Sequence, residues 1–189
     1  MSLEVMPGHV AVLVPSASRA AAHLAELGFE IGPAQEWHEE GTLEVYVEKQ
    51  RSNALLLMEA VGPGPYQDAL AKRGPGLHHL AIDVLDVKGF VGSLSGSGWL
   101  LHPRSLETLT STRTAFLARP GFPALIEVQE RDELAPREPL VTAVELPLSV
   151  DATRLLAAIR LHEIVVASEP GSDTTLTLAG ARLPVSALL

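Results

Sequence analysis

Two histidines, His9 and His79, each stand near the start of an apolar stretch, and the stretches are similar to each other: GHVAVLVP from Gly8 and LHHLAIDV from Leu77. Each stretch is followed later in the chain by an apolar strand that carries a carboxylate, which in the second copy is Glu127. A histidine at the same point of two repeats, together with Glu127, can bring two imidazoles and a carboxylate to one metal ion. Such a donor set suits divalent Zn, Fe, Co, Ni or Mn and leaves positions open for substrate oxygens.

The composition is that of a globular protein, because 47% of the 189 residues are hydrophobic and 20% are charged. The chain has no cysteine, so metal ligands must come from His, Asp or Glu. The net charge of −9 and the lack of a basic run argue against nucleic-acid binding. No apolar run is long enough to cross a membrane, and residues 1–9 do not resemble a signal peptide. We therefore expect a cytoplasmic protein with a small-molecule substrate, no nucleic acid and no membrane.

Apolar periodicity and turn residues predict two copies of one βαβββ unit, an α+β fold with modules at about residues 5–64 and 75–130. In the first copy we expect a strand, a helix and three strands at His9–Val14, Ser16–Leu27, Phe29–Ile31, Thr42–Val47 and Ala54–Val61. A short amphipathic segment, Pro65–Arg73, follows. In the second copy we expect a strand, a helix and two further strands at Leu77–Val84, Val87–Leu94, Thr112–Ala118 and Ala124–Gln129.

The segment 131–139 has the composition of a linker, since it is charged and contains two prolines. Beyond it, residues 140–189 have the element order of a partial third module, with a strand at Thr142–Leu148, a helix capped by Asp151, and strands at Glu163–Ala167, Thr174–Leu178 and Arg182–Leu188. This C-terminal extension has no histidine at the first-strand position, so we expect it to be structural or to form a homodimer.

The segment Tyr66–Val84, YQDALAKRGPGLHHLAIDV, resembles the central segment of methylmalonyl-CoA epimerases, within the vicinal oxygen chelate (glyoxalase and bleomycin-resistance) superfamily. The resemblance extends through GHVAVLVP, EEGTLEVYV and ALLLMEAVGP to TAFLARPGFPALIEVQE, and covers roughly residues 5 to 130. It implies one glyoxalase-like domain at residues 1–130, in which two βαβββ modules form a cleft around a divalent metal.

The resemblance also implies the metal ligands, which lie on the first and last strands of each module. His9, His79 and Glu127 match three of them, and the fourth position falls on Leu56 or Leu57. Glu59, two residues past Leu57, is an alternative ligand if the strand is shifted, and otherwise water fills the place or the metal is lost. Because neighbouring strand residues point to opposite faces, only one histidine of the pair 78–79 can enter the cleft. The resemblance selects His79 and leaves the other outside.

The catalytic residues that the resemblance implies are Glu44 and Glu127. In the epimerases a glutamate on a middle strand of the first module acts as the base, opposite the liganding glutamate of the second, and Glu44 in GTLEVYV matches it. The metal would polarise a carbonyl, so that a proton on the neighbouring carbon becomes removable. The alternation of TLEVYVEK is equally compatible with Glu44 facing solvent beside Thr42.

Several other polar and aromatic residues receive a structural interpretation. The tryptophans, Trp37 and Trp99, are expected to anchor packing rather than to contact substrate. The remaining histidines lack ligand spacing and are expected at the surface: His23, His38, His102 and His162. Three cations can hold a phosphorylated substrate but are more often solvated: Lys72, Arg73 and Arg119.

Three functions remain open from the sequence. The first is a metal-dependent isomerase, epimerase or lyase that transfers a proton next to a carbonyl or thioester. The second is a non-haem iron dioxygenase of the extradiol type, which the two-His, one-Glu set favours. The third is a metal-free protein that binds or sequesters a small molecule, which the leucine at the fourth position favours.

Overall fold

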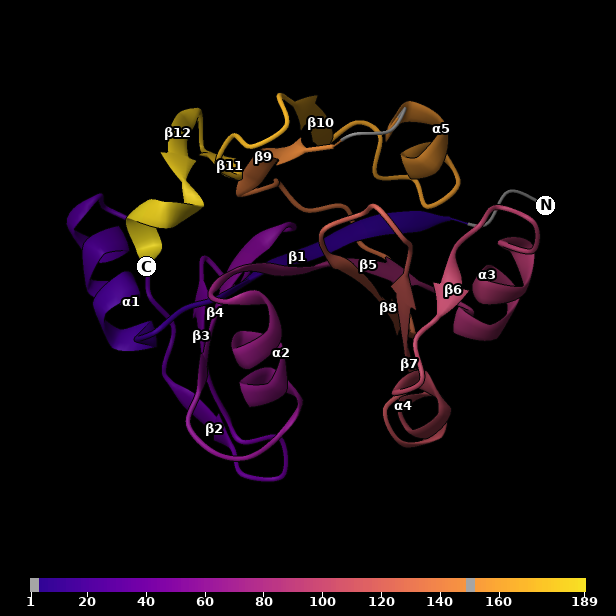
Figure 1. Cartoon of the computed structure of the whole chain (residues 1–189), viewed down its shortest axis with the longest axis horizontal. Coiled ribbons are helices and arrows are strands. Elements are labelled where there is room, and N and C mark those ends of the chain that lie inside the picture. The colour runs from indigo at the N-terminus through magenta and orange to yellow at the C-terminus, as the bar shows by residue number, and fades with distance from the viewer. Residues whose placement is uncertain (1–3, 149–151) are drawn as a thin grey trace.

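The computed structural model describes residues 4–148 and 152–189 and contains an eight-stranded and a four-stranded sheet (Figure 1). The first repeat consists of β1 (Val5–Leu13), α1 (Ala17–Glu26), β2 (Gln35–Trp37), β3 (Thr42–Val47) and β4 (Ala54–Ala60), and α2 (Pro65–Arg73) follows it. The prediction of a strand at Phe29–Ile31 is wrong. Ile31 makes an isolated bridge to Val47, and the strand that pairs with β3 begins four residues later, at Gln35.

The second repeat consists of β5 (Gly76–Val84), α3 (Val87–Ser93), β6 (Leu100–Leu101), α4 (Ser105–Ser111), β7 (Thr114–Ala118) and β8 (Leu125–Glu130). Its short β6 and the helix α4 were not expected from the sequence, because SLETLTS has no clear apolar period. The predicted α+β fold with two βαβββ modules is confirmed.

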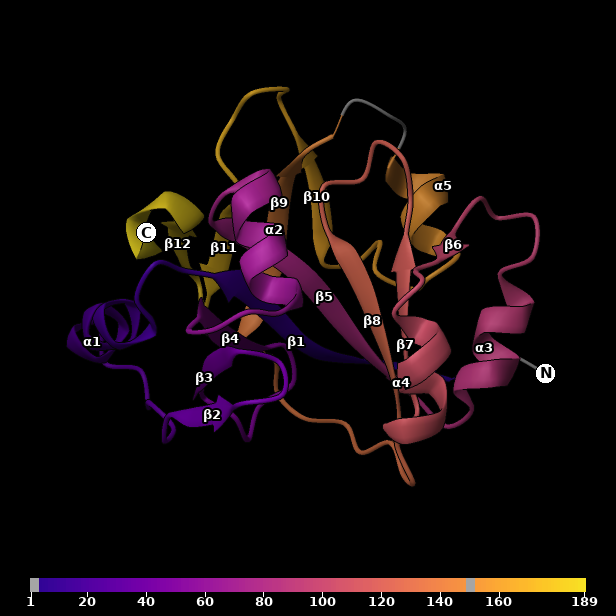
Figure 2. The same cartoon turned by 60° about the horizontal axis from the view of Figure 1, so that its bottom comes forward.

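The two modules join edge to edge in one continuous sheet of order β2-β3-β4-β1-β5-β8-β7-β6. Within each module the first strand pairs with the last in parallel, β1 with β4 and β5 with β8. The first strands of the two modules then pair with each other in antiparallel fashion. The histidine-bearing strands therefore lie side by side at the centre of the sheet, which Figure 2 shows from a second direction.

The two module helices begin in the same way, which is direct evidence for the internal repeat. Glu59 at the end of β4 accepts a hydrogen bond from the backbone N–H of Ala17, the first residue of α1, at 2.8 Å. Glu130 at the end of β8 accepts the matching bond from Val87, the first residue of α3, at 3.0 Å. A carboxylate at this place satisfies a free N–H group and interacts favourably with the positive end of the helix.

The C-terminal extension forms the second sheet from β9 (Val141–Pro147), β10 (Val165–Ser168), β11 (Thr175–Leu178) and β12 (Ala181–Pro184), with α5 (Ala152–Ala157) and a 3₁₀ helix at Val185–Leu188. Its element order is that of a module, but its strand order is β10-β9-β11-β12. The first strand is central and pairs with β10 and β11, whereas the first strand of a true module pairs with its last. The expected helix cap, Asp151, lies outside the described residues.

The main core lies between the two sheets. Alternate residues of the central strands, such as Val10 and Leu80, belong to the same buried cluster as Val144 and Leu176 of the C-terminal sheet. Figure 1 shows the extension as a layer above the eight-stranded sheet, with α2 and α4 below it. The extension therefore covers the sheet face opposite to the one that carries His79. Within the described residues, the helices are all too short or too polar to cross a bilayer.

Candidate metal and catalytic site

Three buried side chains converge on the open face of the large sheet. The Nε2 atoms of His9 and His79 lie 2.9 Å apart. Oε2 of Glu127 lies 3.3 Å from Nε2 of His9 and 3.1 Å from Nε2 of His79. These spacings are close to the roughly 3 Å between neighbouring ligand atoms that metal–ligand bonds of about 2 Å produce. The three residues that the sequence nominated as ligands are thus brought together.

Two irregularities in the pairing of β1 with β5 change the direction in which the histidine side chains leave the strands. The register shifts once at Gly8 and His9 and once at His78, and these bulges occupy equivalent places in the two modules. A bulge lets a strand turn a side chain away from its regular direction and is common beside active sites. Gly8 allows the close approach of the two strands there, since a Cβ atom would lie 3.1 Å from the carbonyl oxygen of Ala81, a tight contact.

Of the pair 78–79, only His79 lines the cavity beside Glu127, but His78 contacts His79 directly. The bulge breaks the simple alternation of faces, so His78 is buried and its Nδ1 lies 2.8 Å from Nδ1 of His79. Its ring also packs against Tyr66, with the ring centroids 5.2 Å apart. Burial lowers the pKa of both histidines, which keeps the imidazoles neutral. A proton on Nδ1 of His79, donated to His78, leaves Nε2 with the lone pair that a metal needs.

Glu127 stays ionised in this setting. Burial alone would raise the pKa of its carboxyl, but the close electrostatic and hydrogen-bond contacts with His79 and His9 lower that pKa well below the usual range. Its second oxygen, Oε1, accepts a hydrogen bond from Nε2 of Gln129 at 3.0 Å. One oxygen of the carboxylate therefore remains directed at the two histidines.

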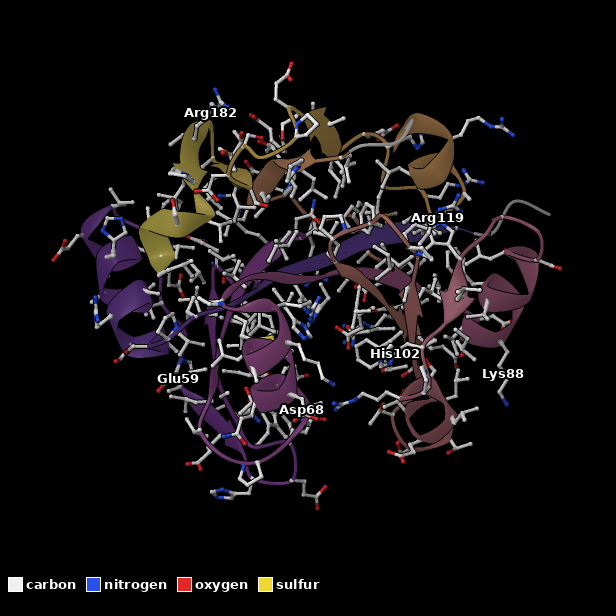
Figure 3. The ribbon with its side chains drawn as sticks, viewed as in Figure 1. Glu59, Asp68, Lys88, His102, Arg119 and Arg182 are labelled. Carbon is white, nitrogen blue, oxygen red and sulfur yellow. The ribbon has the colours of Figure 1, made fainter. Side chains whose placement is uncertain are left out.

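Leu56 is the first-module counterpart of Glu127. The helix-capping glutamates align the two modules, and the residue three places before each is Leu56 before Glu59 and Glu127 before Glu130. Leu56 lines the cavity beside the histidines, whereas Leu57 belongs to the core on the other face. Glu59 cannot replace the missing ligand, because its carboxylate caps α1 beside that helix (Figure 3).

The convergent side chains open into a cavity of about 740 Å³. Glu44 on β3 is half-buried in its wall, and the neighbouring Thr42 is fully buried rather than exposed. Burial raises the pKa of Glu44 to about 7, and the charges of Glu40 and Glu127 add to this effect against the opposing influence of His9. Desolvation thus brings the pKa of Glu44 into the range in which a carboxylate can act as a base near neutral pH.

Some cavity residues were not found from the sequence. His102 lines the cavity rather than the general surface, and Trp37 is a half-exposed part of its wall instead of a packing anchor. Trp99, in contrast, is buried against Phe122 as expected, with ring centroids 5.4 Å apart. Figure 3 shows His102 and Asp68 on the two sides of the space between α2 and β7. Nothing in the sequence spacing marks His102 and Trp37 as cavity residues, since they come from a loop of the second module and a short strand of the first.

The donor set fits a divalent metal. Two neutral imidazoles and one carboxylate are buried and share one focus, and none of the three is neutralised by a nearby Lys or Arg in an ion pair within the described residues. His9, His79 and Glu127 would hold the ion. Among the described residues, no fourth His, Asp or Glu offers a ligand atom at this focus.

Comparison with known proteins places the chain in a superfamily. A sequence model of the Glyoxalase/Bleomycin resistance protein/Dioxygenase superfamily matches residues 8–116, and the chain belongs to this superfamily. No curated protein sequence matches it.

Solved structures share the fold. A hypothetical protein, BH1468 from Bacillus halodurans C-125, is 20% identical with a TM-score of 0.56, over 71% of this chain and 99% of that one. Methylmalonyl-CoA epimerase from Mycobacterium tuberculosis is 23% identical with a TM-score of 0.50, over 69% and 89%. A Streptomyces coelicolor methylmalonyl-CoA epimerase variant in complex with 2-nitronate-propionyl-CoA is 20% identical with a TM-score of 0.51, over 69% and 100%. At these identities the likeness concerns the fold.

Proposed function

We propose that the protein is a metal-dependent isomerase or lyase of the glyoxalase type, which moves a proton at the carbon next to a carbonyl or thioester. The convergence of His9, His79 and Glu127 within one buried focus carries this proposal. A divalent ion of Zn, Co, Ni, Mn or Fe bound there supplies Lewis-acid polarisation of a carbonyl. The solved epimerase that holds a nitronate analogue of propionyl-CoA supports a reaction of this class.

Glu44 is the proposed base. Its half-buried carboxylate lines the same cavity as the three ligands, and a pKa of about 7 lets it accept a carbon-bound proton and release it again near neutrality. Glu127 is the proposed ligand and the carboxylate opposite Glu44. Its low pKa suits a ligand better than a proton donor, so Glu44 is the residue on which proton transfer depends.

Metal analysis tests the proposal. The full chain is loaded with Co²⁺, Zn²⁺, Mn²⁺, Ni²⁺ or anaerobic Fe²⁺, dialysed and assayed for bound ion, beside His79→Ala and the matched exposed control His162→Ala. We expect close to one ion per chain in wild type and His162→Ala, and a large loss in His79→Ala. Equal metal content in wild type and His79→Ala would remove the site. Deuterium exchange at the α-carbon of acyl thioesters and hemithioacetals then tests the chemistry.

A dioxygenase is the second candidate, and His102 favours it. An extradiol enzyme needs an acid/base histidine near a two-His, one-carboxylate iron site, and His102 lines the same cavity. Oxygen consumption by the Fe²⁺-loaded protein with catechols would select this function, while α-carbon exchange without oxygen uptake would reject it. The cytoplasmic location and a homodimer formed through residues 140–189 also stay proposals.

A further inference from the structure

A second, smaller pocket of about 270 Å³ adjoins the 740 Å³ cavity that is lined by His9, His79 and Glu127, which we call the metal cavity. It lies between α2 and the β7–β8 side of the second module. The two spaces are contiguous, because several residues line both: Pro65, Tyr66, His102, Arg104 and Phe116. A ligand that reaches the metal site can therefore extend a group into the smaller pocket.

The smaller pocket is positively charged although the protein carries a net charge of −9. Lys72, Arg73 and Arg104 line it, against one carboxylate, Asp68. Lys72 and Arg73 are exposed and make no ion pair within the described part of the chain, and desolvation lowers the pKa of the Arg73 guanidinium without a carboxylate to offset it. His102 lies in the same positive field, since burial and then the charges of Arg104 and Arg73 lower its pKa.

Arg104 is held at the boundary between the two pockets. Its guanidinium carbon lies 5.7 Å from the ring centroid of Tyr66 and 5.6 Å from that of Phe116. One N–H group of the same guanidinium is bonded to Glu40 at 2.6 Å. Of the residues that line the metal cavity, Arg104 is the sole Lys or Arg, against several carboxylates. A guanidinium fixed on two rings presents a planar set of donors that matches a carboxylate or phosphate.

We propose that the pocket formed by Lys72, Arg73 and Arg104 is an anion subsite that takes a carboxylate or phosphate group of the substrate. The assignment as a substrate subsite rests on the proposed function of the adjoining metal cavity. It narrows the substrate class to carbonyl compounds that carry an anionic group, because an anion complements the charge of Lys72, Arg73 and Arg104, whereas a neutral group does not.

Glu40 competes with an incoming anion for the guanidinium of Arg104. It comes from the turn before β3 in the first module, and its ion pair with Arg104 of the second module joins the two lips of the cavity. An incoming anion must share Arg104 with Glu40 or displace it. Removing the Glu40 charge should therefore strengthen anion binding, whereas removing the Arg104 charge should weaken it.

Direct titration of the full chain with malonate and with inorganic phosphate, at constant ionic strength, tests the proposal. The measurement is made with and without a chelator, so that binding to the metal is separated from binding to the subsite. In chelator we expect Arg104→Gln to weaken binding of at least one anion about tenfold and Glu40→Gln to tighten it severalfold. Tighter malonate binding would indicate a carboxylated substrate, and tighter phosphate binding a phosphorylated one.

Arg182→Gln is the matched control, since Arg182 also pairs with a single carboxylate but lies on β12, away from the cavity (Figure 3). Equal affinities for Arg104→Gln and Arg182→Gln, or no tightening in Glu40→Gln, would overturn the proposal. The Glu40 variant keeps Arg104 in place, so its result stands even where Arg104→Gln fails to fold. If the proposed metal site does not exist, wild type will bind no metal in the metal analysis. That result is distinct from weak anion binding in chelator, which tests only the subsite.

Discussion

Gln129 donates a hydrogen bond from Nε2 to Oε1 of Glu127 at 3.0 Å, and this contact extends the candidate metal site along β8. The amide oxygen of Gln129 accepts a hydrogen bond from Arg131, whose Nε is bonded to Oδ1 of the buried Asp83 at 2.8 Å. Because a guanidinium has only donors, it fixes the amide with its oxygen toward Arg131 and its NH₂ group toward Glu127. The Glu127 carboxylate is thus oriented by a chain of three residues, Gln129, Arg131 and Asp83, that are not among the proposed ligands.

We expect Gln129→Leu to weaken metal binding about 10- to 100-fold, since partners that orient a ligand have effects of this size. Arg131→Gln should have a smaller effect in the same direction, because the Gln129 amide would lose its fixed orientation. Competition with a chromophoric chelator measures the affinity. Gln50→Leu, at an exposed glutamine outside the site, is the control. An unchanged affinity in Gln129→Leu would show that the Glu127 carboxylate does not need this support.

Leu56 occupies the position of the missing fourth ligand, which predicts that a substitution there can strengthen metal binding. Leu56 is the first-module counterpart of Glu127, so a carboxylate or amide placed there points at the same focus. We expect Leu56→Gln to raise metal affinity about tenfold, which corresponds to roughly 1.4 kcal/mol. The control is Leu57→Gln, which buries the amide in the core and should destabilise the fold instead. A decrease in affinity for Leu56→Gln would mean that the wild-type site is complete with three protein ligands.

The repeat made much of the architecture predictable. His9 and His79 mark equivalent strands, and alternating apolar residues on both sides of them indicated two βαβββ modules and a face for the core. The three convergent side chains follow from that symmetry. The tail was predictable in element order but not in strand pairing, because a short strand such as β9 carries no information about which neighbours it will find.

Other parts of the site depend on features that a sequence does not display. His78 became buried through a bulge, and a single extra residue in a pairing cannot be inferred from alternation alone. The choice between Leu56 and Leu57 needed the register, which the two capping glutamates supply only in three dimensions. Arg104 and His102 come from a loop that packs against α2, so their role depends on tertiary contact rather than local pattern.

The capping glutamates predict a stability effect that is separate from metal binding. We expect Glu59→Ala to lower the free energy of unfolding by about 1 kcal/mol, the usual cost of removing a helix cap. Glu130→Ala should have a similar effect at α3. Urea denaturation beside the exposed control Glu26→Ala measures the difference. Metal affinity should not change in Glu59→Ala, and a loss of affinity would make Glu59 a ligand after all.

Glu44 predicts the pH dependence of turnover. With a pKa raised to about 7 by burial, its carboxyl is protonated and inactive as a base at pH 5 and ionised at pH 8. For α-carbon exchange we expect kcat/KM to rise with pH, to be half-maximal near the pKa of about 7, and to reach a plateau above about pH 8. Glu44→Gln should abolish exchange and still bind metal, because Glu44 is not one of the three ligands. Loss of metal in this variant would contradict the division of roles.

The same raised pKa predicts that wild type loses stability as the pH increases. The folded protein holds the Glu44 proton up to about pH 7, whereas the unfolded chain releases it near the ordinary glutamate pKa of 4.5. Between these values the folded state binds more protons, so its stability falls with rising pH, and Glu44→Gln escapes this loss. After allowance for the solvent contact of a half-buried group, we expect Glu44→Gln to gain about 1 to 2 kcal/mol over wild type between pH 5 and pH 8. Urea unfolding in chelator at both pH values measures this gain, and a constant difference between the two proteins would show that burial does not hold the proton on Glu44.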